Sequence, residues 1–274
     1  MCTTCGCGKD ARPTLTNMNG DKVANIQIHD HHHIHSHDQA HEPHHHHPPA
    51  LGTIISLEKE ILAKNNMLAA RNRTWFEEKN ILALNLVSSP GSGKTTLLER
   101  TIRDLGDETE ISVIEGDQET ENDAARIRRT GCRVVQINTG TGCHLESNML
   151  ARGVEELQPP ANSIVMIENV GNLVCPALFD LGERAKVLIF SVTEGEDKPQ
   201  KYPHMFRAAE IVILNKTDLL PYIKFDMEKC IQFIRQVNPG VRIVPLSATG
   251  GEGLNPWYGW LRERHKEGSS NLTL

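Results

Sequence analysis

The most specific chemistry in this sequence lies in a glycine- and serine-rich stretch at residues 88–96, which reads SSPGSGKTT. The stretch follows an apolar run at 81–87 and opens a helix-like segment, which is the setting of a phosphate-binding loop. Its glycines let backbone N–H groups point at phosphate oxygens, Lys94 neutralises phosphate charge, and the Thr95 hydroxyl binds Mg²⁺. The expected phosphate-binding residues are Gly91, Ser92, Gly93, Lys94, Thr95 and Thr96.

The loop departs from the G-x-x-x-x-G-K-[ST] pattern at its first position, where Ser88 replaces glycine. The turn that leaves the strand must therefore accept a residue with a Cβ atom. An ordinary glycine/serine turn is the alternative. Lysine and threonine at fixed offsets after an apolar run favour the nucleotide site.

A second motif, N-K-x-D, indicates which base the nucleotide carries, and it directly follows the apolar run at 211–214. At the carboxyl end of a parallel strand, the Asp218 carboxylate can accept hydrogen bonds from N1–H and the exocyclic amine of guanine, which adenine does not offer. Lys216 would lie along the base, and a backbone N–H at 247–248 would bind guanine O6. The motif is weak alone, but after a phosphate loop it predicts GTP. The expected base-binding residues are Asn215, Lys216, Asp218, Ser247 and Ala248.

Two carboxylates stand at the ends of further strand-like runs. Glu168 follows the run 164–167, where nucleotide-binding folds place a carboxylate near Mg²⁺ and a glycine, here Gly171, that senses the γ-phosphate. Glutamate replaces the commoner aspartate, so direct and water-mediated metal contacts are both open. Asp117 would hold Mg²⁺ or position the attacking water, with a turn aspartate as the alternative. The expected catalytic residues are Lys94, Asp117 and Glu168.

The chain starts with a C-x-x-C-x-C cluster made of Cys2, Cys5 and Cys7 with interspersed glycines. Three neighbouring thiolates make a soft site for an ion such as Ni²⁺ or Zn²⁺. A redox C-x-x-C pair is the alternative, and it is disfavoured because no βαβ pattern surrounds the cysteines.

A histidine tract follows, with eleven histidines between His29 and His47. Imidazole groups suit several divalent ions, so the tract is expected to bind them loosely and to buffer or store them. An expression tag is the alternative. The tract is internal and interrupted by acidic residues, which disfavours a tag.

A second cysteine–histidine group lies near the nucleotide motifs. Cys143 and His144 follow T-G-T-G at an expected helix start, and Cys175 lies just beyond the loop at 168–171. One chain supplies two or three ligands here, so four-coordination would require two subunits meeting face to face. A structural role is the alternative, but loops on the nucleotide side favour a metal site.

Composition narrows the class of protein. A length of 274 residues, 38% apolar and 23% charged, predicts one or two globular domains. A net charge of −6 without a Lys/Arg block argues against nucleic acid or an anionic membrane as partner. The apolar runs are strand-length, so neither a membrane span nor a secretory signal is expected. The seven cysteines are expected to be thiols in the cytoplasm, with Cys132 and Cys230 as small apolar fillers.

The elements must bring these loops to one edge of a sheet. Residues 1–52 lack a periodic apolar pattern and are expected to form a flexible Cys/His-rich metal-binding arm, while residues 53–274 form a P-loop GTPase domain. A helix is expected from Ser56 to about Lys79. Beyond it, alternating runs predict an α/β fold with a mostly parallel sheet and helices on both faces. The expected strands are 81–87, 111–115, 133–137, 163–168, 187–193, 210–214 and 241–246, and the expected helices are 97–105, 120–129, 145–157, 201–208, 226–237 and 255–266.

The C-x-x-C-x-C start, the histidine tract, the phosphate loop, G-C-H-L at 142–145, E-N-V-G-N-L at 168–173 and N-K-T-D at 215–218 together resemble the HypB family of hydrogenase nickel-incorporation GTPases. The resemblance covers essentially the whole chain. It implies a GTP-dependent homodimer that passes nickel to the large subunit of a nickel–iron hydrogenase and works with a HypA-type protein.

The resemblance also assigns two metal sites. The tight nickel ligands would be Cys2, Cys5 and Cys7, and the weaker site at the dimer interface would comprise Cys143, His144 and Cys175. The related urease GTPase UreG has a Cys-Pro-His pairing, whereas the cysteine and histidine are adjacent here.

The predicted function is slow, regulatory GTP hydrolysis whose nucleotide state governs metal binding, with GTP, Mg²⁺ and Ni²⁺ as ligands and Zn²⁺ as a further candidate. One alternative is a nickel-storage protein with a vestigial GTPase domain. Another is a zinc-type or urease-type metallochaperone of related fold. The Lys94→Ala variant separates storage from delivery, because storage predicts normal hydrogenase activity in cells that carry it.

Overall fold

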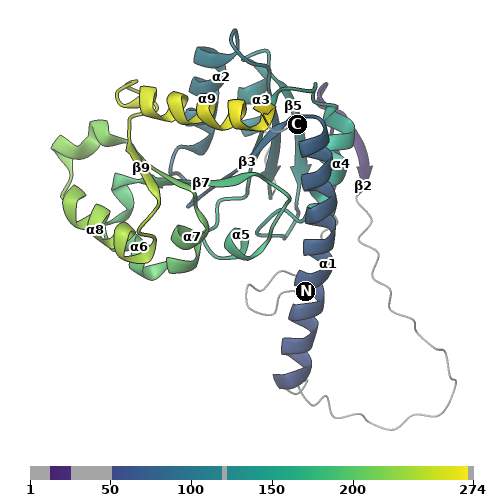
Figure 1. Cartoon of the computed structure of the whole chain (residues 1–274), viewed down its shortest axis with the longest axis horizontal. Helices are drawn as coiled ribbons and strands as arrows, with labels where there is room; N and C mark the ends of the chain where they lie inside the picture. The colour runs from purple at the N-terminus through teal and green to yellow at the C-terminus, as the bar shows by residue number, and fades with distance from the viewer. Residues whose placement is uncertain (1–12, 26–50, 119–121, 271–274) are drawn as a thin grey trace, which may run out of the picture.

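The computed structural model describes residues 13–25, 51–118 and 122–270. Their strands form one sheet in the order β2-β1-β5-β4-β6-β3-β7-β8-β9, with β3 near its centre (Figure 1). The pairs among β3 to β9 are parallel, which confirms the expected α/β class with a mostly parallel sheet. The strands are β1 Thr14–Thr16, β2 Lys22–Asn25, β3 Leu82–Ser88, β4 Ile111–Asp117, β5 Arg133–Asn138, β6 Ile164–Glu168, β7 Ala185–Ser191, β8 Ile211–Asn215 and β9 Arg242–Pro245.

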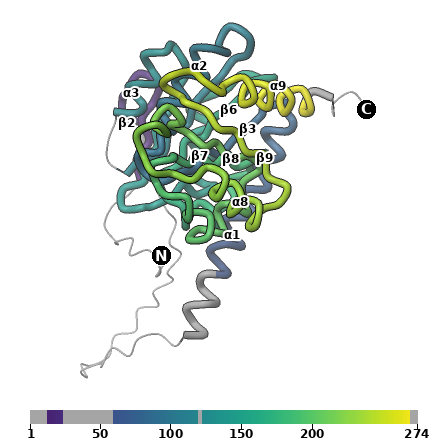
Figure 2. The backbone as a smooth tube through the Cα atoms, turned by 90° about the vertical axis from the view of Figure 1, so that its left-hand side faces the viewer, coloured from purple at the N-terminus to yellow at the C-terminus, as the bar shows by residue number. Residues whose placement is uncertain are grey.

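Helices cover both faces of this sheet, as Figure 2 shows with α2 and α9 above the strands and α8 below them. The α-helices are α1 Leu51–Glu78, α2 Lys94–Leu105, α3 Asn122–Arg128, α4 Ser147–Leu157, α5 Cys175–Leu178, α6 Lys198–Lys201, α7 Pro203–Ala208, α8 Met227–Val237 and α9 Leu254–Ser270. Two 3-10 helices, η1 Val192–Glu194 and η2 Thr217–Tyr222, follow β7 and β8.

The alternation of side chains along β3 explains this layering. Leu82, Leu84 and Leu86 belong to a core with α2, α3 and α9, whereas Ala83 belongs to a second core with α1 and α4. Val87 belongs to a third core with α7 and α8. A strand buried on both faces needs a continuous apolar run, which is why these strands are recognisable in the sequence.

The amino-terminal assignment needs a correction. Residues 13–25 were expected to belong to the flexible arm, but they form the β1–β2 hairpin at the edge of the sheet. In this hairpin β1 pairs antiparallel with β5, which places Leu15 opposite Ile137 with its side chain buried. Strands of three and four residues are too short to give a readable alternation. Residues 1–12 and 26–50, with Cys2, Cys5, Cys7 and the histidine tract, lie outside the described residues.

Helix α1 begins at Leu51, five residues before the expected start at Ser56, and it packs along α4. Arg73 of α1 forms an ion pair with Asp180 in which Nη2 contacts both carboxylate oxygens, at 2.8 and 2.9 Å. The pair fixes α1 to the loop that follows α5. Among the described residues, no helix combines the length and apolarity required to cross a membrane.

Candidate nucleotide and metal sites

The phosphate loop connects β3 to α2 at the carboxyl edge of the sheet, as expected. Gly91 and Gly93 adopt positive φ angles of 74° and 92°. A Cβ atom at Gly93 would lie 2.5 Å from Asn215 Nδ2, so this position requires glycine for both its dihedral angle and its neighbour. Ser88 is buried, its hydroxyl donates to Ser89 O at 2.7 Å, and its φ is not positive, which explains why serine fits the first position of the motif.

Three side chains from other loops hold the phosphate loop in shape. Asn215 Nδ2 donates to Ser92 O at 2.8 Å, and Lys216 Nζ donates to Gly91 O at 2.6 Å. The Ser92 hydroxyl donates to Glu194 Oε1 at 2.6 Å. Sequence reasoning missed Glu194, although its S-x-x-E capping box with Ser191 was a readable signal.

The expected base-binding residues gather beside this loop. Asn215 is buried at the end of β8, and Asp218 is exposed in η2. The backbone N–H of Ala248 donates to Asn215 Oδ1 at 3.1 Å, and the Ser247 hydroxyl accepts from Gly250 N at 2.8 Å. Here the Ala248 N–H orients Asn215, so binding guanine O6 would require an exchange of partner.

A buried carboxylate lies next to the first turn of α2. Glu168, 3% exposed at the end of β6, accepts a hydrogen bond from the Thr95 hydroxyl at 2.7 Å, and its Oε1 lies 3.9 Å from Lys94 Nζ. Burial raises the pKa of Glu168, and Lys94 and Thr95 oppose that rise. Glu168 Oε2 is buried without a hydrogen-bond partner. Oxygen ligands of this kind fit Mg²⁺.

A second buried carboxylate, Glu115, stands beside Glu168 and was missed by sequence reasoning. The register of β4 and β6 pairs Glu115 with Glu168, and Glu115 is 2% exposed. Burial raises its pKa to about 9, with further contributions from Glu168 and from Asp117 at the end of β4. A single glutamate in an apolar run gives no sign of this pairing; only the strand register shows it.

The second cysteine–histidine group is assembled as expected. Candidate ligand atoms of Cys143, His144 and Cys175 all lie within 4.8 Å of one another. Cys143 Sγ lies 3.0 Å from Cys175 Sγ and 3.6 Å from His144 Nδ1. Helix α4 begins three residues after His144, whereas Cys175 opens α5. Three soft or borderline ligands suit Zn²⁺ or Ni²⁺ and leave one position of a tetrahedron for an outside ligand.

The state of His144 favours metal binding. Its side chain is 7% exposed, Nε2 is buried without a hydrogen-bond partner, and the Phe179 ring lies 3.9 Å away between centroids. Burial lowers the pKa of His144 to about 4. The imidazole is therefore neutral near pH 7, and the neutral form is the one that binds metals.

The remaining cysteines in the described part of the chain lie elsewhere. Cys230 is fully buried in the core with α7 and α8, and Cys132 packs against the core formed by α2, α3 and α9. Burial raises the pKa of both thiols to about 12. Both observations confirm the expected role of Cys132 and Cys230 as apolar fillers.

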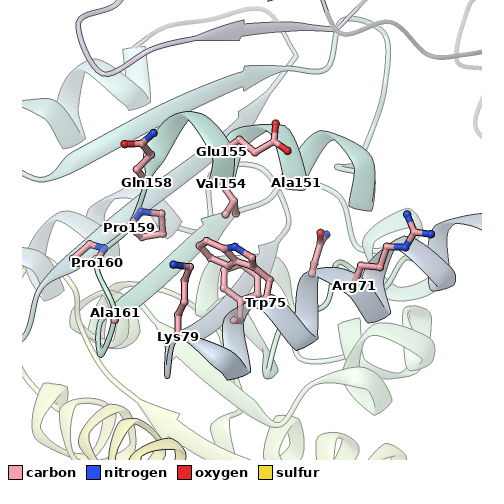
Figure 3. A pocket seen from close by; sticks show the side chains of 12 residues that line it. Arg71, Trp75, Lys79, Ala151, Val154, Glu155, Gln158, Pro159, Pro160 and Ala161 are labelled. Atoms are coloured by element: carbon pink, nitrogen blue, oxygen red, sulfur yellow. The ribbon is translucent and has the colours of Figure 1, made fainter.

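A cavity of about 610 Å³ lies away from these loops, between α1 and α4 (Figure 3). It is lined by Trp75 of α1, by Lys79 directly after that helix, by Val154 of α4, and by Pro159 and Pro160, which follow α4. Lys79 Nζ sits 5.0 Å from the centre of the Trp75 ring. No expected site residue lines this cavity, so the nucleotide assignment rests on the loops at the carboxyl edge of the sheet.

Comparison with known proteins agrees with the geometry. Residues 82–245 match the family model described as CobW/HypB/UreG, nucleotide-binding domain. The hydrogenase maturation factor HypB of Escherichia coli K12 is 49% identical over 288 residues, which cover 95% of this chain and 98% of that protein. The HypB of Rhizobium leguminosarum bv. viciae is 60% identical over 76% of this chain and 70% of its own length.

Two solved structures are similar over most of the described chain. Archaeoglobus fulgidus HypB has a TM-score of 0.70 and 37% identity, covering 74% of this chain and 99% of that one. Helicobacter pylori HypB, solved in complex with nickel, has a TM-score of 0.70 and 36% identity, covering 74% of this chain and 96% of that one.

Proposed function

This chain belongs to the HypB family of hydrogenase maturation factors, and on that premise we propose that it is a GTP-hydrolysing nickel metallochaperone. It would deliver nickel to the large subunit of a nickel–iron hydrogenase during maturation. One observation carries the proposal: a single continuous segment joins the oxygen-rich nucleotide site to the Cys/His cluster, with Glu168 of the first site at its start and Cys175 of the second at its end.

GTP is the nucleotide that this site suits best. Asn215 and Lys216 are held against the phosphate loop by short hydrogen bonds, and Asp218, two residues further on, would then lie beside the base. A carboxylate there selects guanine by accepting from N1–H and the exocyclic amine. Lys216 has a left-handed φ of 64°, a strained conformation of the kind found at functional sites.

The phosphate loop offers the positively polarised groups that GTP hydrolysis requires. The N–H groups around Gly91 and Gly93 and the ammonium group of Lys94 stabilise charge that develops on the phosphates. Thr95 and Glu168 would hold Mg²⁺, which supplies further charge neutralisation when bound. Asp117, at the end of β4, would orient the attacking water.

The metal cargo would occupy two places. The cluster of Cys143, His144 and Cys175 would bind Ni²⁺, with Zn²⁺ as a competitor, and the amino-terminal Cys2, Cys5 and Cys7 would bind nickel more tightly. Transfer would involve a HypA-type accessory protein and take place in the cytoplasm.

A homodimer would complete the cluster. Cys175 is flanked by exposed apolar side chains, since Val174 is 52% exposed and Leu178 is 55% exposed. Apolar groups exposed around an incompletely coordinated site favour a protein interface there. GTP-dependent pairing of two subunits would bury them and add ligands from the second chain.

A nickel-storage protein is the competing function, favoured by the histidine tract. Delivery predicts that cells carrying Lys94→Ala lose hydrogenase activity, because Lys94 lies 3.9 Å from Glu168 in the phosphate site. Storage predicts normal activity in the same cells. Metal stoichiometry measured with GDP and with a non-hydrolysable GTP analogue tests the coupling directly: delivery requires the two nucleotides to give different metal affinities.

A further inference from the structure

The segment from Glu168, the last residue of β6, to Cys175, the first residue of α5, contacts the phosphate loop on one side. Glu168 accepts the hydrogen bond of Thr95 at 2.7 Å. Three residues later, Gly171 packs on Pro90, because a Cβ atom at Gly171 would lie 3.1 Å from Pro90 Cα. Glu168 and Gly171 therefore form the face of this segment that touches the nucleotide loop.

Two asparagines of the same segment contact the metal loop, residues 143–145, instead. Asn169 Oδ1 accepts the backbone N–H of Leu145, the residue after His144, at 3.1 Å. Asn172 Nδ2 donates to the carbonyl of Cys143 at 3.4 Å. The segment thus alternates between its two neighbours, and each asparagine holds the backbone of a metal-loop residue.

Asn169 is the more deeply engaged of the two. It is 1% exposed, and its Oδ1 also accepts the backbone N–H of Val170 at 2.9 Å. Rotation of this side chain would leave both N–H groups buried without an acceptor, which is costly. Leu145 is also confined, because a Cβ atom at Gly116 of β4 would lie 2.7 Å from Leu145 Cγ. The two loops are therefore constrained to move together.

A second route runs from Asn169 through buried polar side chains to the ring beside His144. Asn169 Nδ2 donates to Asn85 Oδ1 at 3.2 Å, and Asn85 Nδ2 donates to Glu183 Oε1 at 3.1 Å. Glu183 is ion-paired with Lys186, which donates to Phe179 O at 3.1 Å. The Phe179 ring packs against His144.

We infer that Asn169 is a positioning residue that couples the nucleotide state to the geometry of the Cys143–His144–Cys175 cluster. The inference rests on the proposed function, since it names the residue through which GTP and metal would affect one another. A change at the nucleotide site would shift Glu168, and the neighbouring Asn169 would then shift the backbone of the metal loop through its hydrogen bond to Leu145. Asn172 provides a weaker parallel contact. Binding free energies linked in this way are reciprocal.

The test uses the full-length chain with Cys2, Cys5 and Cys7 changed to serine, so that the thiolate-to-nickel charge-transfer absorption reports the cluster alone. Cys132 and Cys230 do not interfere, because burial raises the pKa of both thiols to about 12 and keeps them protonated. Nickel is titrated with GDP and with a non-hydrolysable GTP analogue, and nucleotide affinity is measured separately without nickel.

Asn169→Ala is the test variant, and Asn172→Ala is a milder variant at a half-buried position that is usable if the first does not fold. Thr101→Val is the matched control. It also removes a buried polar group, since the Thr101 hydroxyl accepts from Trp257 Nε1 at 2.9 Å, but it makes none of the contacts described above. Any loss of stability common to all three variants is thereby separated from coupling.

In the serine background without further change, we expect the two nucleotides to change nickel affinity by about 5- to 150-fold. Asn169→Ala should remove most of this difference and leave only the smaller part carried by Asn172, while GTP-analogue affinity without nickel stays near that of the background protein. Asn172→Ala should reduce the ratio partly, and Thr101→Val should leave it unchanged. A ratio that stays undiminished in folded Asn169→Ala, or in Asn172→Ala where the first is unfolded, overturns the inference alone. A ratio of one in the background protein overturns the coupling in the proposed function as well.

Discussion

Replacement of Asp218 by asparagine tests the choice of nucleotide most directly. The amide would present a donor where guanine N1–H needs an acceptor. Because Asn215 and Lys216 are fixed by hydrogen bonds of 2.8 and 2.6 Å to the phosphate loop, the base-binding loop is preformed, so the change should act on the contact itself. Losing one charge-assisted hydrogen bond costs about 1.5–3 kcal/mol, or roughly 10- to 150-fold in GTP affinity. Asp218 is exposed, so we expect a value toward the lower end.

The assay is competition against a fluorescent guanine nucleotide, with GTP, xanthosine triphosphate and ATP as competitors. Xanthosine triphosphate should gain relative to GTP, since its base carries a carbonyl that can accept from the new amide. Asp107→Asn is the matched control, because Asp107 is also exposed but lies just beyond the opposite end of α2 from the phosphate loop. Equal competition by ATP and GTP in the unchanged protein, or equal losses in both variants, would refute the guanine assignment.

Three further predictions follow from the geometry. Glu115→Gln should raise the melting temperature of the nucleotide-free protein little near pH 5 and more near pH 8. Burial raises the folded-state pKa of Glu115 to about 9, so the unchanged protein loses stability as pH rises above the carboxyl pKa of the unfolded chain. A gain in melting temperature that does not depend on pH would contradict this. Gly93→Ala should abolish GTP binding, measured by calorimetry, because its Cβ would lie 2.5 Å from Asn215 Nδ2 at a φ of 92°; retained affinity would contradict this. Cys143→Ala should remove cluster binding but spare tight nickel binding, measured by equilibrium dialysis, and loss of the tight site would show that the arm is not independent.

The sequence predicted the sheet well because its strands are buried on both faces. The expected run 111–115 appears as β4, and 210–214 appears as β8 with a shift of one residue. The β1–β2 hairpin was not predicted because short edge strands contain few side chains that must be apolar. In such a fold, local periodicity predicts which segments form helices and strands, whereas the strands at the sheet edge depend on pairing between distant segments.

The residues of the candidate site fall into the same two groups: those predicted from local sequence and those that depend on distant contacts. Residues in motifs, such as Lys94 and Glu168, were predicted because fixed spacing around a glycine loop dictates their chemistry. Glu115, Glu194 and Asn169 were not assigned roles, because each acquires its role from a partner far away in the sequence. Their identities become informative only when strand register and loop contacts are known.

The two sites differ in hardness, which bears on how nickel handling can be tied to GTP. The nucleotide side offers oxygen ligands from Thr95 and Glu168, which suit Mg²⁺, whereas the cluster offers sulfur and imidazole, which suit nickel or zinc. The ions therefore have little tendency to exchange places. The cluster sulfur atoms lie 3.0 Å apart, so two thiolates would repel one another until a cation neutralises them. Small changes in the spacing of Cys143 and Cys175 should thus alter metal affinity strongly, and the spacing depends on a segment whose first residue is held by the phosphate loop.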